Sequence, residues 1–109
     1  HSTLLGFSQG AATACRWLND GHIRADRLIL WAGFFPNGLT DMIDPNRLVD
    51  METHYVYGRQ DEFIEDIADA TTYMRRMQQE VPTLRITAYD GTHRVEPDVL
   101  AALLNESAH

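Results

Sequence analysis

The stretch Gly6-Phe7-Ser8-Gln9-Gly10 decides the fold expected of this chain. An apolar run, residues 3–5, precedes it, and an alanine-rich run, residues 11–18, follows it. That order predicts a strand, a sharp turn and a helix, with Ser8 at the apex of the turn. We expect Ser8 to adopt a strained backbone conformation that lifts its hydroxyl clear of the sheet. Gly6 and Gly10 lack side chains that would collide with the turn or with the returning helix.

The size and charge of the chain limit its class. It has 109 residues, 44% of them hydrophobic, which is enough for one modest globular domain. Its net charge of −7 argues against a nucleic-acid partner, because phosphate binding needs a basic face. No apolar run approaches the ~20 residues of a membrane span, and no charged-then-apolar leader is present, so we expect a cytoplasmic protein. The single cysteine, Cys15, excludes an internal disulfide and is expected to be a small buried hydrophobe.

Apolar runs and helical stripes alternate along the rest of the chain. Residues 2–5 and 27–32 predict buried strands, residues 53–58 predict a third strand, and the alternation over residues 84–89 predicts a half-exposed strand near a sheet edge. Residues 33–51 read as irregular. Helices are predicted over residues 9–19, around a stripe formed by Phe63, Ile67, Ala70, Met74 and Met77, and over residues 95–104. This order predicts an α/β fold whose parallel sheet of about four strands is flanked by helices.

A serine hydroxyl is a weak nucleophile near neutral pH, so Ser8 needs two partners. A base must take its proton, and a third group must orient that base and stabilise its cation. Reacting groups in parallel α/β sheets gather at the carboxyl ends of the strands. The candidates are therefore an acid and a histidine that directly follow later strands.

Asp61 lies between the third predicted strand and its helix, three residues after Gly58. One interpretation is that Asp61 only caps that helix. The other is that Asp61 is the acid of the site, and the two roles are compatible. Asp90 is a second candidate acid, because it is close to His93 in the sequence.

His93 is the candidate base, because it follows the fourth predicted strand. Histidine can accept a proton and return it near neutral pH. The remaining histidines are predicted at the chain termini or at the other end of the sheet: His1, His22, His54 and His109. The histidines show no metal-ligand spacing and no glycine-rich phosphate loop follows a strand, so we expect neither a metal nor another cofactor.

With Ser8, Asp61 and His93 placed, the chain resembles the phospholipase/carboxylesterase family, the bacterial esterases similar to acyl-protein thioesterases. Four motifs carry the resemblance: G-F-S-Q-G at 6–10, L-W-A-G at 30–33, Y-G-R-Q-D-E-F-I at 57–64 and D-G-T-H at 90–93. It runs from residue 1 almost to the C-terminus. The resemblance implies an α/β-hydrolase in which Ser8 occupies the nucleophile elbow.

The resemblance also implies an activity, the hydrolysis of small carboxylic esters through an acyl-enzyme. Ser8 would attack the carbonyl, His93 would transfer the proton, and Asp61 would orient His93. The backbone N–H of Gln9 would be one donor of the oxyanion hole. Thioesterase or lysophospholipase action with the same three residues is an alternative. Four residues either wall an acyl pocket or pack as ordinary core under a loop: Phe34, Phe35, Met42 and Ile43.

Members of this family carry further strands, and the loop with the second oxyanion donor, before the elbow. We therefore expect residues 1–109 to be the C-terminal half of an α/β-hydrolase domain. The strand at 2–5 would then present an unpaired apolar edge, which invites pairing. Its partner would be the N-terminal half of the same enzyme. In an alternative of a different class, the chain is a non-catalytic half-domain that self-associates as a homodimer.

Overall fold

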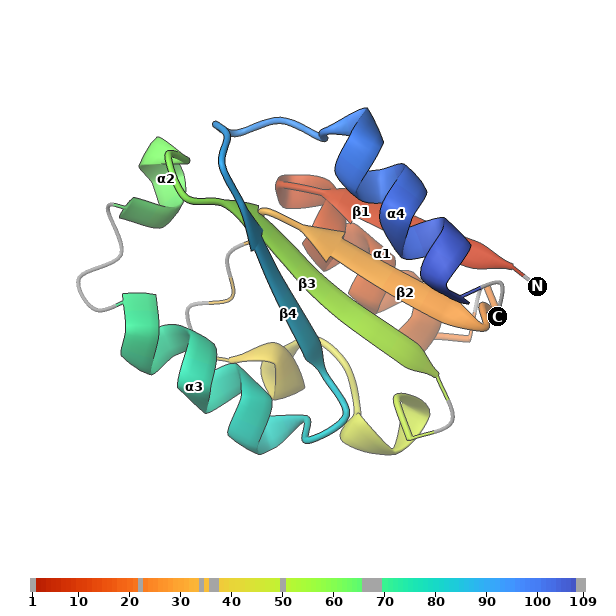
Figure 1. Ribbon diagram of the computed structural model, residues 1–109. Helices are drawn as coiled ribbons and strands as arrows, with labels where there is room; N and C mark the ends of the chain where they lie inside the picture. The colour runs from red at the N-terminus through yellow and green to blue at the C-terminus, as the bar shows by residue number, and fades with distance from the viewer. Residues whose placement is uncertain are drawn as a thin grey trace.

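Four parallel strands form one sheet in the order β1-β2-β3-β4 (Figure 1). The computed structural model describes residues 2–21, 23–33, 35, 38–49, 51–65 and 70–107. The strands are β1 (Thr3–Phe7), β2 (Arg27–Trp31), β3 (Glu52–Gly58) and β4 (Arg85–Tyr89). All three neighbouring pairs are parallel, so each connection must cross over the sheet. The predicted α/β fold with a parallel sheet of about four strands is confirmed.

Helices cover both faces of this sheet. They are α1 (Gln9–Asn19), α2 (Glu62–Glu65), α3 (Ala70–Glu80) and α4 (Pro97–Ser107), with 3₁₀ turns η1 (Leu39–Asp41) and η2 (Pro45–Arg47). In Figure 1, α4 lies against one face, and α1 and α3 lie against the other. The helix predicted around residues 63–77 is described as two helices, α2 and α3, on either side of residues 66–69. Of its predicted stripe, Met74 and Met77 are buried, whereas Ile67 and the side chains of Phe63 and Ala70 lie outside the described part.

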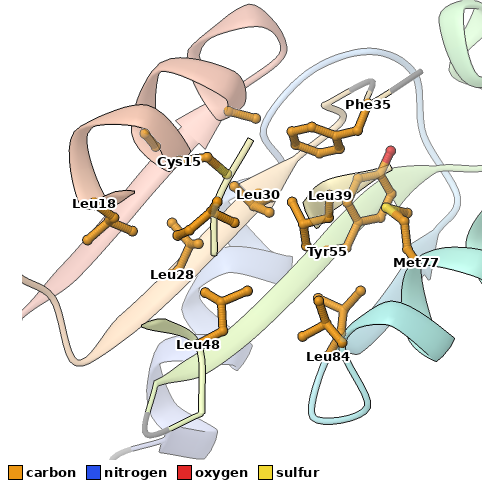
Figure 2. Packing of buried hydrophobic residues seen from close by; sticks show 14 of the residues in the cluster. Cys15, Leu18, Leu28, Leu30, Phe35, Leu39, Leu48, Tyr55, Met77 and Leu84 are labelled. Atoms are coloured by element: carbon orange, nitrogen blue, oxygen red, sulfur yellow. The ribbon is translucent and has the colours of Figure 1, made fainter. Parts of the chain in front are cut away.

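Each face of the sheet has its own hydrophobic core. Side chains that alternate along a strand point to opposite faces, so neighbouring residues of β2 enter different cores. The larger core packs α1 and α3 on the sheet (Figure 2) and includes Cys15, Leu18, Leu28, Leu30, Phe35, Leu39, Leu48, Tyr55, Met77 and Leu84. The core beneath α4 contains Ile29, Trp31, Ala32, Val56, Tyr89 and Leu103. A continuous apolar run such as β2 is typical of a strand covered on both sides.

The two edge strands are only partly buried. β4 is half-exposed, as its alternating sequence predicted. β1 was predicted to be a buried strand, but Thr3 and Leu5 are exposed because, within the described residues, β1 pairs with β2 alone. Leu5 keeps 39% of its surface exposed. The predicted apolar edge is therefore present in the described structure.

Gly6 allows α1 to pack closely on β1. A Cβ atom at Gly6 would lie 2.6 Å from the Cα of Ala11 and 2.6 Å from the carbonyl oxygen of Gly10. Both are backbone atoms, so a side chain there would force the helix away from the strand. Gly10 differs from its prediction, since a Cβ on Gly10 would meet no described atom within 4 Å.

Cys15 is fully buried in the larger core. Burial raises the pKa of its thiol from 9.0 to about 12, because the thiolate would have to leave water. The residue is therefore a small neutral hydrophobe, as predicted. No helix in the described ranges is long and apolar enough to cross a membrane.

Replacing Gly6 with alanine tests the close contact between strand and helix. We expect Gly6→Ala to lower the free energy of unfolding by about 2–3 kcal/mol, because the clash is with backbone. Urea denaturation of the complete natural protein measures the change. Gln79→Ala, a substitution at an exposed position of α3, is the control and should stay within about 0.5 kcal/mol. Equal effects of the two variants would show that the contact does not constrain the fold.

Candidate active site

Ser8 occupies the tight turn between β1 and α1. Its backbone angles are φ 56° and ψ −119°, which is a strained conformation for a residue with a side chain. The Ser8 N–H donates to the carbonyl of Trp31 on the neighbouring strand at 2.7 Å, and this bond anchors the turn. The Ser8 side chain does not cap α1. The Ser8 hydroxyl faces His93 instead.

Three predicted residues converge at the carboxyl ends of the strands. The Nε2 atom of His93 lies 3.0 Å from the Oγ atom of Ser8. The Nδ1 atom of the same ring lies 2.6 Å from Oδ2 of Asp61. Asp61 is fully buried, and the His93 side chain is 19% exposed. A carboxylate only accepts hydrogen bonds, so Nδ1 donates to Asp61 and Nε2 is left to accept from the serine hydroxyl.

Backbone hydrogen bonds join the loop after β3 to the loop after β4. The N–H of Arg59 donates to the Tyr89 carbonyl at 2.8 Å, and the N–H of Gln60 donates to the Gly91 carbonyl at 3.0 Å. A Cβ atom at Gly58 would collide with the Gly91 carbonyl. Because Gly58 has no side chain, the two loops can lie this close, and Asp61 reaches His93.

Aromatic residues that sequence reasoning missed surround the His93 loop. The Tyr89 hydroxyl lies 2.5 Å from the Arg94 carbonyl and 3.1 Å from the Thr92 carbonyl. The Nε1–H of Trp31 donates to both the Tyr89 hydroxyl and the Arg94 carbonyl at 3.0 Å. The Phe7 ring packs 4.9 Å from the His93 ring, centroid to centroid. Phe7, Trp31 and Tyr89 are the last residues of β1, β2 and β4, and this position is the sequence signal that could have identified them.

The alternative acid and histidine lie elsewhere. The Asp90 side chain is 81% exposed and pairs with Nη1 of Arg59 at 2.9 Å. His54 is buried in the amino-terminal half of β3, with its Nε2 atom 2.9 Å from Oε2 of Glu52. His54 is therefore level with the middle of β2, where it pairs in register with Ile29, and lies before the carboxyl end of β3. The other histidines lie outside the described residues: His1, His22 and His109.

A cavity of about 540 Å³ opens beside Ser8. Its lining includes Ser8, His93 and Gln9, the first residue of α1. The first backbone N–H groups of a helix have no acceptor within the helix, and no described group accepts from Gln9 N–H. That donor is therefore available beside the serine. Another cavity, of about 520 Å³, is lined by Ser2, Asp26 and other residues near the amino ends of β1 and β2, far from this site.

The residues considered for an acyl pocket are placed differently. Phe35 and Ile43 are each 1% exposed and belong to the larger core, and Met42 packs against that core. None of these three lines the cavity beside Ser8. The three residues therefore pack in or against the core in the described structure, and a role in an acyl pocket of the complete enzyme stays a prediction. Phe34 lies outside the described residues.

The described ranges contain no group of three or more histidine, cysteine, aspartate or glutamate residues that could hold a metal ion. The chemistry available at the site is that of a serine hydroxyl, an imidazole, a buried carboxyl group and a free backbone N–H.

A comparison with protein families identifies the family of the chain. Residues 1–98 match the family described as Serine hydrolase (FSH1). The chain belongs to this serine hydrolase family. The resemblance inferred from the four motifs is thereby confirmed, and the described residues have the α/β-hydrolase fold. No curated protein sequence gives a significant match.

Solved structures share the fold at low sequence identity. Acyl-protein thioesterase 2 from Zea mays is 15% identical, with a TM-score of 0.64 over 95% of this chain and 53% of that one. MGS-M1, an alpha/beta hydrolase enzyme from a Medee basin deep-sea metagenome library, is 13% identical, with a TM-score of 0.58 over 97% and 51%. S-formylglutathione hydrolase from Staphylococcus aureus is 15% identical, with a TM-score of 0.55 over 96% and 48%. The chain therefore spans about half the length of these proteins.

Replacing Gly58 with alanine tests how the two loops meet. The added Cβ must displace the Gly91 carbonyl, and the loop that carries His93 moves with it. We expect a crystal structure of Gly58→Ala to show the His93 Nε2 atom beyond hydrogen-bond distance of Ser8 Oγ, with the sheet unchanged. Gln60→Ala is the control, because its exposed side chain leaves the backbone bond to Gly91 in place. An unchanged His93 in Gly58→Ala would contradict the account.

Proposed function

We propose that Ser8, His93 and Asp61 form a catalytic triad that hydrolyses carboxylic esters. The observation that carries the proposal is the hydrogen-bonded line from buried Asp61 through His93 to the Ser8 hydroxyl. The three residues follow three different strands, β1, β3 and β4, and their side chains meet at one point. Membership of a serine hydrolase family supports the same reaction class.

The reaction follows from the position of each atom. Ser8 Oγ attacks the ester carbonyl carbon as its proton passes to His93 Nε2. Asp61 holds the ring through Nδ1 and stabilises the imidazolium. The tetrahedral intermediate collapses, the bond to the alcohol breaks, and His93 gives the proton to the departing oxygen. Water then attacks the acyl-enzyme with His93 as the base, which releases the acid and restores Ser8.

The negative oxygen of the intermediate needs donors. The Gln9 N–H lies beside the nucleophile at the positive end of α1, and we propose it as one donor. A second donor would come from outside the described residues. Loss of one oxyanion donor typically costs about 10²- to 10³-fold in rate, so efficient turnover requires both.

Thioester hydrolysis is a second candidate, because the same triad accepts either acyl donor. The likeness to a structure called an acyl-protein thioesterase gives it specific support. Matched oxygen and sulfur esters of one acyl group separate the two, since only the leaving atom differs. Lysophospholipids extend the same comparison to a long-chain acyl group.

For the complete enzyme, we propose that residues 1–109 are the C-terminal half of one α/β-hydrolase domain. The chain aligns with about half of each similar structure. The β1 edge is open among the described residues, and a groove of about 260 Å³ runs between it and α1. Leu5 and Trp17, which is 50% exposed, line that groove beside Gly10. Further strands of the same enzyme would cover these apolar side chains.

Self-association through the β1 edge remains the alternative from another class. The same open edge favours it, because a second copy could pair there. Size-exclusion chromatography of the complete natural protein, with esterase turnover measured on each fraction, separates the two. An active monomer supports the single-domain proposal, and an inactive dimer supports self-association.

Substitution of the two candidate acids tests the triad. Asp61→Asn should lower kcat for a 4-nitrophenyl ester by about 10⁴-fold, because an amide at this position favours the wrong histidine tautomer. Ser8→Ala should abolish acyl-enzyme formation. Asp90→Asn is the matched control and should change kcat less than about twofold, since its exposed side chain pairs with Arg59. Equal losses at Asp61 and Asp90, or turnover by Ser8→Ala, would refute the triad.

A further inference from the structure

We propose that the cavity beside Ser8 takes esters that carry an anionic group, and that Arg16 binds this group. The inference rests on the proposed function and narrows its substrate class. Arg16 lies on α1 and lines the same cavity as Ser8 and His93. The guanidinium is positively charged at every physiological pH and recognises carboxylate or phosphate oxygens in two-pronged hydrogen bonds.

One face of α1 forms the path from the nucleophile to Arg16. Gln9, Ala12, Thr13 and Arg16 all line the cavity, and their spacing of three, one and three places them on one side of the helix. The rise of an α-helix separates the Cα atoms of Gln9 and Arg16 by about 10 Å along the axis. The guanidinium is therefore within reach of a second group on a substrate whose ester carbonyl lies at Ser8.

The charges around the cavity favour an anion at Arg16. No aspartate or glutamate is among the described residues that line it. Arg59 pairs with Asp90 and Arg94 pairs with Glu96, whereas Arg16 makes no ion pair with any described residue. Arg24 and Arg47 make none either, but they line the other cavity, at the amino ends of β1 and β2. Because the chain as a whole carries a charge of −7, an anionic ester has little other attraction to this surface.

The remaining lining residues indicate which kind of spacer would join the ester to the anionic group. Ala12, Ala32 and Ile64 are apolar and mostly small, so they suit a short hydrocarbon spacer between the ester and the anion. The volume of about 540 Å³ lies within the range of small-molecule pockets. The monoester of a dicarboxylic acid is the simplest compound with this arrangement.

Matched substrates test the assignment on the complete natural protein. 4-Nitrophenyl hydrogen glutarate carries a carboxylate at the end of its acyl chain, whereas 4-nitrophenyl pentanoate has an acyl chain of the same length without the charge. The butyrate esters of 4-hydroxybenzoate and phenol make the same comparison on the alcohol side. We expect kcat/KM for one charged ester to fall about tenfold in Arg16→Gln, with its uncharged partner unchanged. Arg24→Gln, which removes an exposed arginine outside this cavity, is the control and should change neither.

The ester pair whose charged member loses kcat/KM in Arg16→Gln shows where the anion binds. A loss in the first pair places it on the acid, and a loss in the second pair places it on the alcohol. Equal effects of Arg16→Gln on charged and uncharged esters, or equal effects of Arg16→Gln and Arg24→Gln, would overturn the inference. Either result would leave ester hydrolysis by Ser8 intact. Turnover that survives Ser8→Ala would instead remove the proposed function.

A separate observation points to Tyr89 as a positioning residue for His93. His93 lies at the centre of a three-residue turn closed by the Arg94 N–H and the Thr92 carbonyl at 2.9 Å. Both carbonyls that flank His93 lie within hydrogen-bond distance of the Tyr89 hydroxyl. We infer that this hydroxyl, acting through the two loop carbonyls, holds the imidazole in line with Ser8.

The environment of Tyr89 suits that role. Burial raises the pKa of its hydroxyl, so the group stays a neutral phenol that can donate. The indole N–H of Trp31 donates to the phenol oxygen, which orients the phenol proton toward the loop. Both side chains belong to the core beneath α4. The loop is thereby fixed to rigid strand ends.

The test separates positioning from a general effect on stability. Tyr89→Phe should lower kcat about ten- to a hundredfold at unchanged KM, because a displaced base slows chemistry without altering substrate binding. Tyr73→Phe is the control. It also removes a partly buried hydroxyl, which accepts from the Phe35 N–H at 2.8 Å on the other face of the sheet, and it should keep kcat. Assays are run well below both melting temperatures.

Amide hydrogen exchange provides a second measurement that does not depend on activity. In Tyr89→Phe the amide of Arg94 should exchange faster than in the natural protein, whereas amides of β2 should not change. Unchanged kcat, or a kcat loss with no faster exchange at Arg94, would overturn the role of Tyr89.

Discussion

The hydrogen bond between buried Asp61 and His93 is the interaction on which the site depends. It requires the loops after β3 and β4 to lie side by side, and the parallel sheet provides this arrangement by placing the carboxyl ends of both strands at one edge. The backbone bonds between these loops, and the missing side chain at Gly58, bring the carboxylate to the ring. With Nδ1 against Asp61, Nε2 of the same ring faces Ser8 Oγ at 3.0 Å.

The second constraint is the turn that carries Ser8. Its positive φ angle is unfavourable for serine, and the surrounding packing must supply the stability that the turn lacks. The close approach of α1 at Gly6 and the bond from Ser8 N–H to Trp31 supply part of it. Trp31 also donates to the loop of His93, so one strand end anchors both the nucleophile and its partner. This shared anchor keeps the Ser8 Oγ atom and the His93 Nε2 atom 3.0 Å apart.

Much of this arrangement could be predicted from sequence because the relevant signals are local. The G-F-S-Q-G turn, the apolar strand β2 and the positions of Asp61 and His93 after strands each follow from a few neighbouring residues. The details that depended on distant contacts were not predictable in this way. The residues around Tyr89 give no sign that its hydroxyl bonds to the loop of His93. Phe35 and Ile43 belong to the core although their segment shows no helical or strand periodicity. The open space at Gly10, where a Cβ would meet no described atom within 4 Å, likewise depends on how distant segments pack.

Covalent capture of the nucleophile tests the central claim most directly. The complete natural protein is treated with a fluorophosphonate, which reacts with an activated serine, and the modified peptide is identified by mass spectrometry. The account predicts a single adduct on Ser8. Labelling of another residue, or no labelling of Ser8 in folded protein, would show that His93 and Asp61 do not activate this hydroxyl.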